Sequence, residues 1–201
     1  MYAIVNEDGR DPRPFVTSIL DAGVRIVQYR AKGGIAAESL RTIRELTRAA
    51  DALLIVNDDW RAAIVFDCDG AHLGPDDDGF AHVPVVRTRF GERLIGLSCG
   101  TVAEAKAVKP KEIDYLGVGS VFATASKSDA GEPIGIEGLR AVAAATKLPI
   151  AAIGGINAEN IDEVHATGVA MAAVISALSS ASDAGAAAHE LVERWNASRR
   201  A

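Results

Sequence analysis

The stretch Ala22-Gly23-Val24-Arg25-Ile26-Val27-Gln28-Tyr29-Arg30-Ala31-Lys32 contains a complete helix-to-strand transition. Gly23 is the kind of residue that ends a helix in the left-handed conformation, and an apolar strand-like segment follows it directly. Polar and cationic side chains then stand two apart, at Gln28, Arg30 and Lys32. Because side chains alternate along a strand, we expect these three to face one way at its end, where their charge suits a strongly anionic group.

The same alternation recurs along the whole chain. Eight runs are predicted as strands: Tyr2–Val5, Arg25–Arg30, Leu53–Asp58, Gly70–Leu73, Leu94–Ser98, Tyr115–Gly119, Pro149–Gly155 and Ala172–Ser176. Most are continuously apolar, which is typical of strands buried on both faces of a parallel sheet. Helical patterns separate them, and Thr101 with Glu104 predicts a capping box at the start of one helix. Eight strands alternating with about eight helices predict a (β/α)8 TIM barrel with short loops.

The composition is that of an ordinary soluble protein. The chain has 201 residues, which we interpret as a single domain over 1–201, and a net charge of −6 that argues against a general nucleic-acid binder. No apolar run is long enough to cross a bilayer, and the chain enters a strand without a signal-peptide pattern. Cys68 and Cys99 are isolated, so we expect neither a disulfide nor zinc. We therefore expect a cytoplasmic protein. The negative charge does not exclude phosphorylated small molecules as ligands, since a few local cations suffice to hold one, and the oligomeric state is not indicated.

Functional side chains of such a barrel gather where the strands end. The polar residues at the predicted ends are Gln28, Arg30 and Lys32; Asn57 and Asp58; His72 and Asp76, Asp77 and Asp78; Ser98; Thr124, Ser126 and Lys127; Gly154 and Gly155; and Ile175 with Ser176. Glycines after the seventh strand and the start of a helix after the eighth predict a monophosphate site at Gly155 and Ser176. A second, more highly charged anion site is predicted near Arg30, Lys32 and Lys127.

Carboxylates beside a cationic site would repel phosphate unless a metal ion lay between them. Asp58 and one aspartate of the fourth loop therefore predict a Mg²⁺ site, because Mg²⁺ takes one or two carboxylates together with phosphate oxygens. The alternatives are that Asp58 caps the next helix, and that Asp76 and Asp78 belong to a solvated turn. His72 is the one well-placed histidine, with a structural or a chemical role open. Cys99 is expected to pack behind its strand, so catalysis would rest on electrostatics and positioning.

The ordered motifs resemble the thiamine-phosphate synthase family over essentially the whole chain. They are Gln28-x-Arg30-x-Lys32, Val56-Asn57-Asp58, His72-Leu73-Gly74-x-x-Asp77, Gly96-x-Ser98, Gly119-x-Val121-Phe122-x-Thr124-x-Ser126-Lys127-x-Asp129, Ala152-Ile153-Gly154-Gly155-Ile156 and Val174-Ile175-Ser176. The double glycine recurs in many phosphate-binding barrels, whereas the diphosphate set together with the Thr-x-Ser-Lys loop is specific.

This resemblance implies a transferase that joins a pyrimidine methyl diphosphate to a thiazole phosphate, releasing pyrophosphate and forming thiamine phosphate. By resemblance, the diphosphate would be held by Arg30, Lys32, Asn57 and Lys127, Mg²⁺ by Asp58 and Asp77, and the pyrimidine by Gln28 and Ser98. The thiazole phosphate would be bound by Thr124, Ser126, Gly155, Ile175 and Ser176. The catalytic roles would fall to Arg30, Ser98 and Lys127. The family's mechanism, in which diphosphate leaves first and the thiazole nitrogen attacks a delocalised cation, agrees with the missing nucleophile.

Two positions depart from the family pattern, which usually has Gln at Pro75 and commonly His at Gly100. Pro75 bears on the loop that reaches Asp77. Gly100 bears on the first alternative, a thiazole tautomerase-like barrel, which uses a histidine near the fifth strand and lacks the diphosphate residues. The second alternative is a non-catalytic barrel that only binds a phosphorylated ligand.

Overall fold

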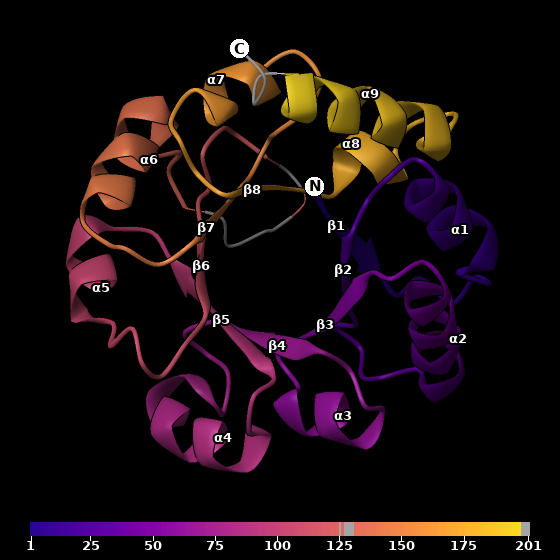
Figure 1. The fold of residues 1–201 in the computed structure, drawn as a ribbon, viewed down its shortest axis with the longest axis horizontal. Helices are drawn as coiled ribbons and strands as arrows, with labels where there is room; N and C mark the ends of the chain where they lie inside the picture. Colours follow the sequence, from indigo (N-terminus) through magenta and orange to yellow (C-terminus); the bar gives the residue numbers. More distant parts are fainter. Residues whose placement is uncertain (125, 127–130, 198–201) are drawn as a thin grey trace.

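A closed barrel of parallel strands forms the centre of the computed structural model, which describes residues 1–124, 126 and 131–197. Its strands are β1 (Tyr2–Asn6), β2 (Ile26–Arg30), β3 (Leu53–Asn57), β4 (Gly70–Leu73), β5 (Leu94–Cys99), β6 (Tyr115–Val118), β7 (Ile150–Ile153) and β8 (Met171–Val174). Each strand pairs with the next in sequence, and β8 closes the barrel on β1 (Figure 1). The predicted TIM barrel is confirmed. The seventh and eighth strands end earlier than predicted, before Gly154 and Ser176.

Helices surround the barrel on its outside (Figure 1). They are α1 (Arg13–Asp21), α2 (Ala37–Ala49), α3 (Trp60–Val65), the 3₁₀ helix η1 (Phe80–His82), α4 (Val83–Phe90), α5 (Val102–Ala107), α6 (Gly135–Ala144), α7 (Ile161–His165), α8 (Ser176–Ser179) and α9 (Ala184–Ala197). Ser176, predicted to end a strand, instead begins the short helix α8. Within the described part of the chain, no helix combines the length and apolarity that crossing a membrane requires.

Local signals in the sequence set several of these boundaries. The side chain of Thr101 accepts a hydrogen bond from the Glu104 backbone N–H at 3.2 Å, and the Glu104 carboxylate accepts one from Thr101, so the predicted capping box is confirmed. Gly23 and Gly168 have φ of +99° and +82° where α1 and α7 give way to the next strand. Both glycines therefore end their helices as predicted, in a conformation that a side chain would disfavour.

The alternation of side chains divides the buried residues into two clusters. The larger lies between the strands and the helices and includes Val27, Leu54 and Leu116. The smaller lies inside the barrel and consists of Tyr2, Ile4, Ile55, Tyr115, Ala151 and Ala173. Because strand residues two apart share a face, Gln28 and Arg30 of β2 face the interior while Val27 and Tyr29 pack outward. The strand register thus decides which polar residues reach the interior.

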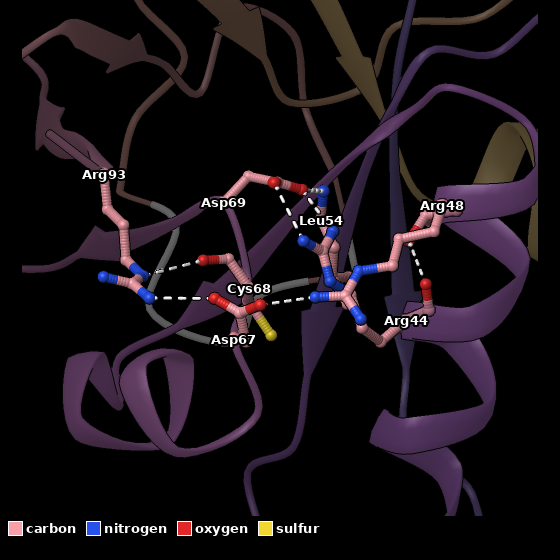
Figure 2. A network of polar contacts seen from close by, with 8 residues as sticks. Arg44, Arg48, Leu54, Asp67, Cys68, Asp69 and Arg93 are labelled. Atoms are coloured by element: carbon pink, nitrogen blue, oxygen red, sulfur yellow. Dashed lines mark hydrogen bonds and ion pairs between the residues drawn. The ribbon is translucent and has the colours of Figure 1, made fainter.

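Ion pairs fix the N-terminal end of the barrel, opposite the end where the strands finish. Asp69, which directly precedes β4, accepts hydrogen bonds from the Leu54 backbone N–H at 2.7 Å and from both terminal nitrogens of Arg44 at 2.6 and 3.1 Å. Figure 2 shows this network, in which Arg48 and Arg93 contact Asp67 from two sides. The network joins α2, β3 and the start of β4.

A second arrangement of the same kind stands two strands further on. Asp114, which precedes β6, accepts a hydrogen bond from the Ile95 backbone N–H at 2.7 Å and one from Arg87 of α4 at 2.5 Å. In each case a helix arginine and a strand N–H share one aspartate. Polar contacts at this end of a TIM barrel serve stability, which leaves the opposite end for function.

Candidate active site

A cavity of about 390 Å³ occupies the barrel interior and the C-terminal ends of the strands. All eight strands contribute to its lining, from Tyr2 on β1 to Ala173 on β8. The volume lies in the range of small-molecule sites, which in TIM barrels form at this end. The cavity is therefore the candidate site.

Of the thirteen residues with a predicted catalytic, substrate-binding or metal-binding role, nine line this cavity: Gln28, Arg30, Asn57, Ser98, Thr124, Ser126, Gly155, Ile175 and Ser176. Arg30 is half-buried as a residue, and its guanidinium donates a hydrogen bond to the side-chain oxygen of Asn6 at 3.2 Å. Arg30 and Asn57 enter from β2 and β3, and Gly155 and Ser176 enter after β7 and β8. The barrel order places β1 between these two pairs on one side and β4, β5 and β6 on the other.

Three of the other four, Lys32, Asp58 and Asp77, do not line the cavity. Lys32 lies exposed in the turn after β2, and Asp58 is exposed where β3 ends. Asp77 is half-buried in the loop after β4. Lys127 lies outside the residues that the structure describes.

Asp58 does not cap the next helix, which was the alternative to a metal role. The N-cap of α3 is Asp59, whose carboxylate accepts a hydrogen bond from the Ala62 N–H at 2.9 Å. Asp58 instead has a φ of +67°. Asp51 and Asp67 also have positive φ, but both follow directly on helix ends, where a left-handed residue is common. At a strand end this left-handed conformation costs energy, and residues held in it cluster at functional sites.

Asp77 folds the loop after β4 back onto its strand. Its carboxylate accepts a hydrogen bond from the Gly74 N–H at 2.5 Å, so one oxygen is engaged by the loop itself. The Asp58 N–H donates to the carbonyl of His72 at 2.8 Å, which holds the end of β3 beside β4. Pro75, the departure noted in the sequence, lines the cavity within this loop. Among the described residues no group of three or more His, Cys, Asp or Glu gathers for a metal ion, whereas Mg²⁺ with phosphate needs only one or two carboxylates.

A chain of hydrogen bonds crosses the cavity from Gln28 on β2 to Ser98 on β5, and we call its five residues the floor of the cavity. Gln28 Nε2 donates to Tyr2 Oη at 2.7 Å, and Tyr2 Oη lies 2.9 Å from Tyr115 Oη. Tyr115 Oη lies 3.2 Å from His72 Nδ1, and His72 Nε2 lies 3.1 Å from Ser98 Oγ. The sequence does not identify the two tyrosines as site residues, because both occupy ordinary apolar strand positions. For His72 it leaves a structural or a chemical role open.

Two glycines make room for the rings of this chain. A Cβ at Gly96 would come within 2.5 Å of the Tyr115 ring and hydroxyl, and one at Gly117 within 2.6 Å of His72 Cε1. Glycine inside a strand weakens it and often marks a close approach of another group. Gly96 and Gly117 were thus the sequence signal for large side chains lying across the barrel.

Burial favours the protonated form of the two tyrosines in this chain. It raises the pKa of the Tyr2 phenol well above its ordinary value, with smaller opposing effects of hydrogen bonds to Tyr115 and Gln28. Burial likewise raises the pKa of Tyr115, and the adjacent Tyr2 adds to the effect. Both phenols therefore keep their protons at neutral pH and act as hydrogen-bond donors.

The loops after β6 and β7 pack tightly against each other at the rim. Gly155 has a φ of +66°, and a Cβ there would lie 2.6 Å from the Ala123 carbonyl oxygen and 2.7 Å from Phe122 Cβ. The Phe122 N–H donates to the Gly154 carbonyl at 2.9 Å, and Asn160 Nδ2 donates to the Gly155 carbonyl at 3.0 Å. These contacts hold the segment leading to Thr124 and Ser126 beside the double glycine.

Fold and site together define a TIM-barrel protein whose cavity, at the C-terminal strand ends, has a polar floor and a glycine-rich rim. The chain belongs to the thiamine monophosphate synthase (TMP-TENI) family, whose model matches residues 1–178.

Individual relatives agree with this family. The thiamine-phosphate synthase of Moorella thermoacetica is 47% identical over 189 residues, which cover 92% of this chain and 89% of that protein. The thiamine-phosphate synthase of Archaeoglobus fulgidus is 45% identical over 94% of this chain and 89% of its own length. A solved thiamine phosphate pyrophosphorylase from Pyrococcus furiosus has a TM-score of 0.87 and 38% identity, covering 98% of this chain and 96% of that one. A 3-hexulose-6-phosphate synthase from Salmonella typhimurium, with a TM-score of 0.74 and 15% identity over 98% of this chain and 100% of that one, shares the fold alone.

Proposed function

We propose that this chain couples 4-amino-2-methyl-5-pyrimidinylmethyl diphosphate to a thiazole phosphate, releasing pyrophosphate and forming thiamine phosphate. The observation that carries the proposal is one cavity that gathers residues of both predicted anion sites around a polar floor. Membership of the thiamine monophosphate synthase family and relatives named thiamine-phosphate synthase support it. Neither the tautomerase nor the purely binding alternative gains support from these relatives.

The diphosphate of the pyrimidine substrate is assigned to the β2–β3 side of the cavity. Arg30 offers a fork of N–H donors that suits phosphate oxygens, and Asn57 lies on the neighbouring strand. Lys32 stands just past the end of β2, where an exposed cation can reach charge at the cavity mouth. Lys127 completes the set as a fourth donor and is proposed to stabilise the departing pyrophosphate.

Asp58 and Asp77 are the proposed Mg²⁺ ligands. The two carboxylates follow adjacent strands, Asp58 is held in a costly backbone conformation, and Asp77 is fixed by its bond to Gly74. The donor set of two carboxylates beside a diphosphate fits the preference of Mg²⁺ for oxygen ligands. When bound, the ion would neutralise charge on the diphosphate.

The phosphate of the thiazole substrate is assigned to the rim at β7 and β8, which β1 separates from the β2–β3 side. Gly155 and Ser176 follow β7 and β8, where TIM barrels commonly hold a monophosphate, and Ile175 lies between β8 and α8. Thr124 and Ser126 add hydroxyl groups, and the Ser126 N–H donates to Thr124 Oγ1 at 3.2 Å.

Catalysis in this arrangement rests on charge and proximity. Arg30 and Lys127 would stabilise the negative charge that grows on the leaving pyrophosphate, and Ser98 with Gln28 would hold the pyrimidine ring over the floor. The C–O bond to pyrophosphate would break first, with its electron pair leaving on pyrophosphate and a cation left delocalised into the aminopyrimidine. The thiazole nitrogen would then form the new C–N bond with its own lone pair, so no nucleophilic side chain is required. Holding the two rings together in the cavity would lower the activation barrier further, through proximity and orientation.

Pyrophosphate release measured with both substrates, and with each omitted, tests this function. We expect release to depend on both substrates and to equal the thiamine phosphate formed. Release with the pyrimidine diphosphate alone would show a hydrolase, and binding without release would show the non-catalytic barrel.

A cytoplasmic location is part of the proposal. Cys68 and Cys99 are free, buried thiols, which suits a reducing compartment. Fractionation of the cells that make the protein tests this assignment.

A further inference from the structure

We propose that Tyr2, Tyr115 and His72 act as positioning residues, forming a directional hydrogen-bond chain that presents Gln28 to the pyrimidine as an acceptor and Ser98 as a donor. This inference rests on the proposed function, because it concerns how the same cavity recognises its pyrimidine substrate.

The first step is the geometry of the chain. Its four links measure 2.7, 2.9, 3.2 and 3.1 Å, and each is a hydrogen-bond distance. Gln28, Tyr2 and Tyr115 are 3%, 2% and 5% exposed, so water cannot readily replace a missing partner. His72 and Ser98 are half-buried where the chain reaches the far wall. A defect at one link therefore has to be met by rearrangement of the others.

The second step is the direction of each link. A tyrosine hydroxyl has one proton to donate. Tyr2 Oη accepts from Gln28 Nε2, so we assign its own proton to its other neighbour in the chain, Tyr115 Oη; the alternative, Tyr115 donating to Tyr2, would leave the buried Tyr2 proton without a partner in the chain. The Tyr115 proton is then assigned to His72 Nδ1. His72 is then the neutral Nε2–H tautomer, and its proton goes to Ser98 Oγ.

The third step concerns the two ends of the chain. With Gln28 Nε2 turned to Tyr2, the amide oxygen of Gln28 is the atom left to accept a bond from a ligand. With its oxygen engaged by His72, Ser98 keeps its hydroxyl proton for a ligand. An acceptor on β2 and a donor on β5 complement a flat heterocycle that carries an amino group and an unprotonated ring nitrogen. An aminopyrimidine has both.

The reverse direction would present the opposite groups. If the Gln28 amide were turned over, Tyr2 would donate to its oxygen, His72 would carry its proton on Nδ1, and Ser98 would donate to His72. The two directions therefore differ in a property of His72, although the choice is made at Gln28, two hydroxyl groups away. This remote dependence distinguishes a chain from a set of independent contacts.

Nitrogen-15 NMR of histidine-labelled protein reads the direction. His72 is assigned among the four histidines by the signals lost in His72→Asn. We expect the neutral Nε2–H form in the wild type, and loss of its predominance in both Tyr115→Phe and Gln28→Leu. The matched control is Tyr29→Phe, which removes a hydroxyl from the same strand that faces outward to Glu7, and it should leave His72 unchanged.

Binding of small probes completes the test. Calorimetry would compare 4-amino-5-hydroxymethyl-2-methylpyrimidine with its 4-oxo counterpart, in which an acceptor replaces the donating amino group. We expect the wild type to prefer the amino compound by about 5- to 150-fold, as for one buried polar group left unpaired, and Tyr115→Phe to reduce that preference. Thiazole phosphate affinity, measured in the same variants, should not change.

An Nδ1–H or doubly protonated His72 in the wild type would overturn the proposal. So would a Gln28→Leu variant that leaves the His72 signals unchanged, or equal affinity for the two probes. The pyrophosphate assay is separate: a directional chain in a protein that releases no pyrophosphate would refute the proposed function and leave the chain intact. If Gln28→Leu does not fold, the His72 tautomer measured in the wild type and in Tyr115→Phe still tests the direction of the chain.

Discussion

Replacing Gly155 by alanine should weaken binding of the thiazole phosphate by displacing the loop after β6. The double glycine suggests at first that a side chain would simply fill the anion site. The structure gives a different reason, because the Cβ would point at Ala123 and Phe122, at 2.6 and 2.7 Å. The loop that must yield is the one that carries Thr124 and Ser126.

The stability cost has two parts. A non-glycine residue in the left-handed region costs about 1–2 kcal/mol, and overpacking a well-packed contact costs about 1–3 kcal/mol. Gly155→Ala should therefore lower the free energy of unfolding by about 2–5 kcal/mol. Gly168→Ala is the matched control, because Gly168 has a φ of +82° with nothing within 4 Å of an added Cβ, so only the first part, about 1–2 kcal/mol, applies.

Urea unfolding measures the loss of stability in each variant, and calorimetry measures the affinity of each variant for the two ligands. For Gly155→Ala we expect thiazole phosphate affinity to fall about 10- to 150-fold, as for the loss of one charge-assisted hydrogen bond, with pyrimidine diphosphate affinity retained. Gly168→Ala should bind both ligands as the wild type does. Equal unfolding costs in the two variants, or unchanged thiazole phosphate binding in Gly155→Ala, would refute the loop-contact explanation.

Four further predictions test the site and its support. Chelation should abolish pyrophosphate release and Asp58→Asn should raise the Mg²⁺ concentration required for it; full activity of this variant at low Mg²⁺ would remove Asp58 from the metal site. Lys127→Ala should lower kcat by about 10²–10³-fold with little effect on thiazole phosphate affinity, and a pure KM change would limit Lys127 to ground-state binding. Ser176→Ala should raise KM for the thiazole phosphate and Arg30→Ala that for the pyrimidine diphosphate, whereas equal weakening of one ligand by both would indicate a single anion site. Asp69→Ala should lower the unfolding free energy in urea by about 2–4 kcal/mol, since it leaves a mostly buried Arg44 and the Leu54 N–H unpaired; no loss would show that this network does not stabilise the barrel.

The fold could be predicted because its strands are continuously apolar and its helices carry clear end signals. Buried parallel strands need no alternation of polar residues, so each run is visible as a block. Strand ends were harder to place. The prediction carried the seventh strand through Gly154 and Gly155, whose positive φ values take them out of the extended conformation.

The candidate site could be predicted in part. Gln28, Arg30 and Ser98 stand on strands, where alternation fixes which way a side chain points, and all three line the cavity. Lys32 and Asp58 stand just past strand ends, where alternation no longer applies, and neither lines it. Sequence spacing can therefore place a residue at the mouth of the barrel without placing its side chain.

The floor was missed for a different reason. Tyr2 and Tyr115 begin their strands and contribute to the apolar runs that identify those strands. Their hydroxyl groups were therefore not predicted to belong to the site. Only the pairing of β5 with β6 shows why Gly96 must be small, because the Tyr115 ring takes the space of a side chain there. Contacts between neighbouring strands of this kind require the register, which no single segment contains.

The proposed reaction gives this floor a chemical purpose beyond recognition. A pyrimidine that has lost its diphosphate would be a strong electrophile, and any ionised oxygen or sulfur beside it would compete with the thiazole nitrogen. Burial raises the pKa of Tyr2, of Tyr115 and of the Cys99 thiol, which also borders the cavity. Each of these groups therefore stays protonated and poorly nucleophilic at neutral pH. In the proposed reaction, a neutral floor beside the cationic β2–β3 side of the cavity would thus separate the two tasks of the site: Arg30 and its neighbours would stabilise the leaving anion, and the floor would hold the cation without capturing it.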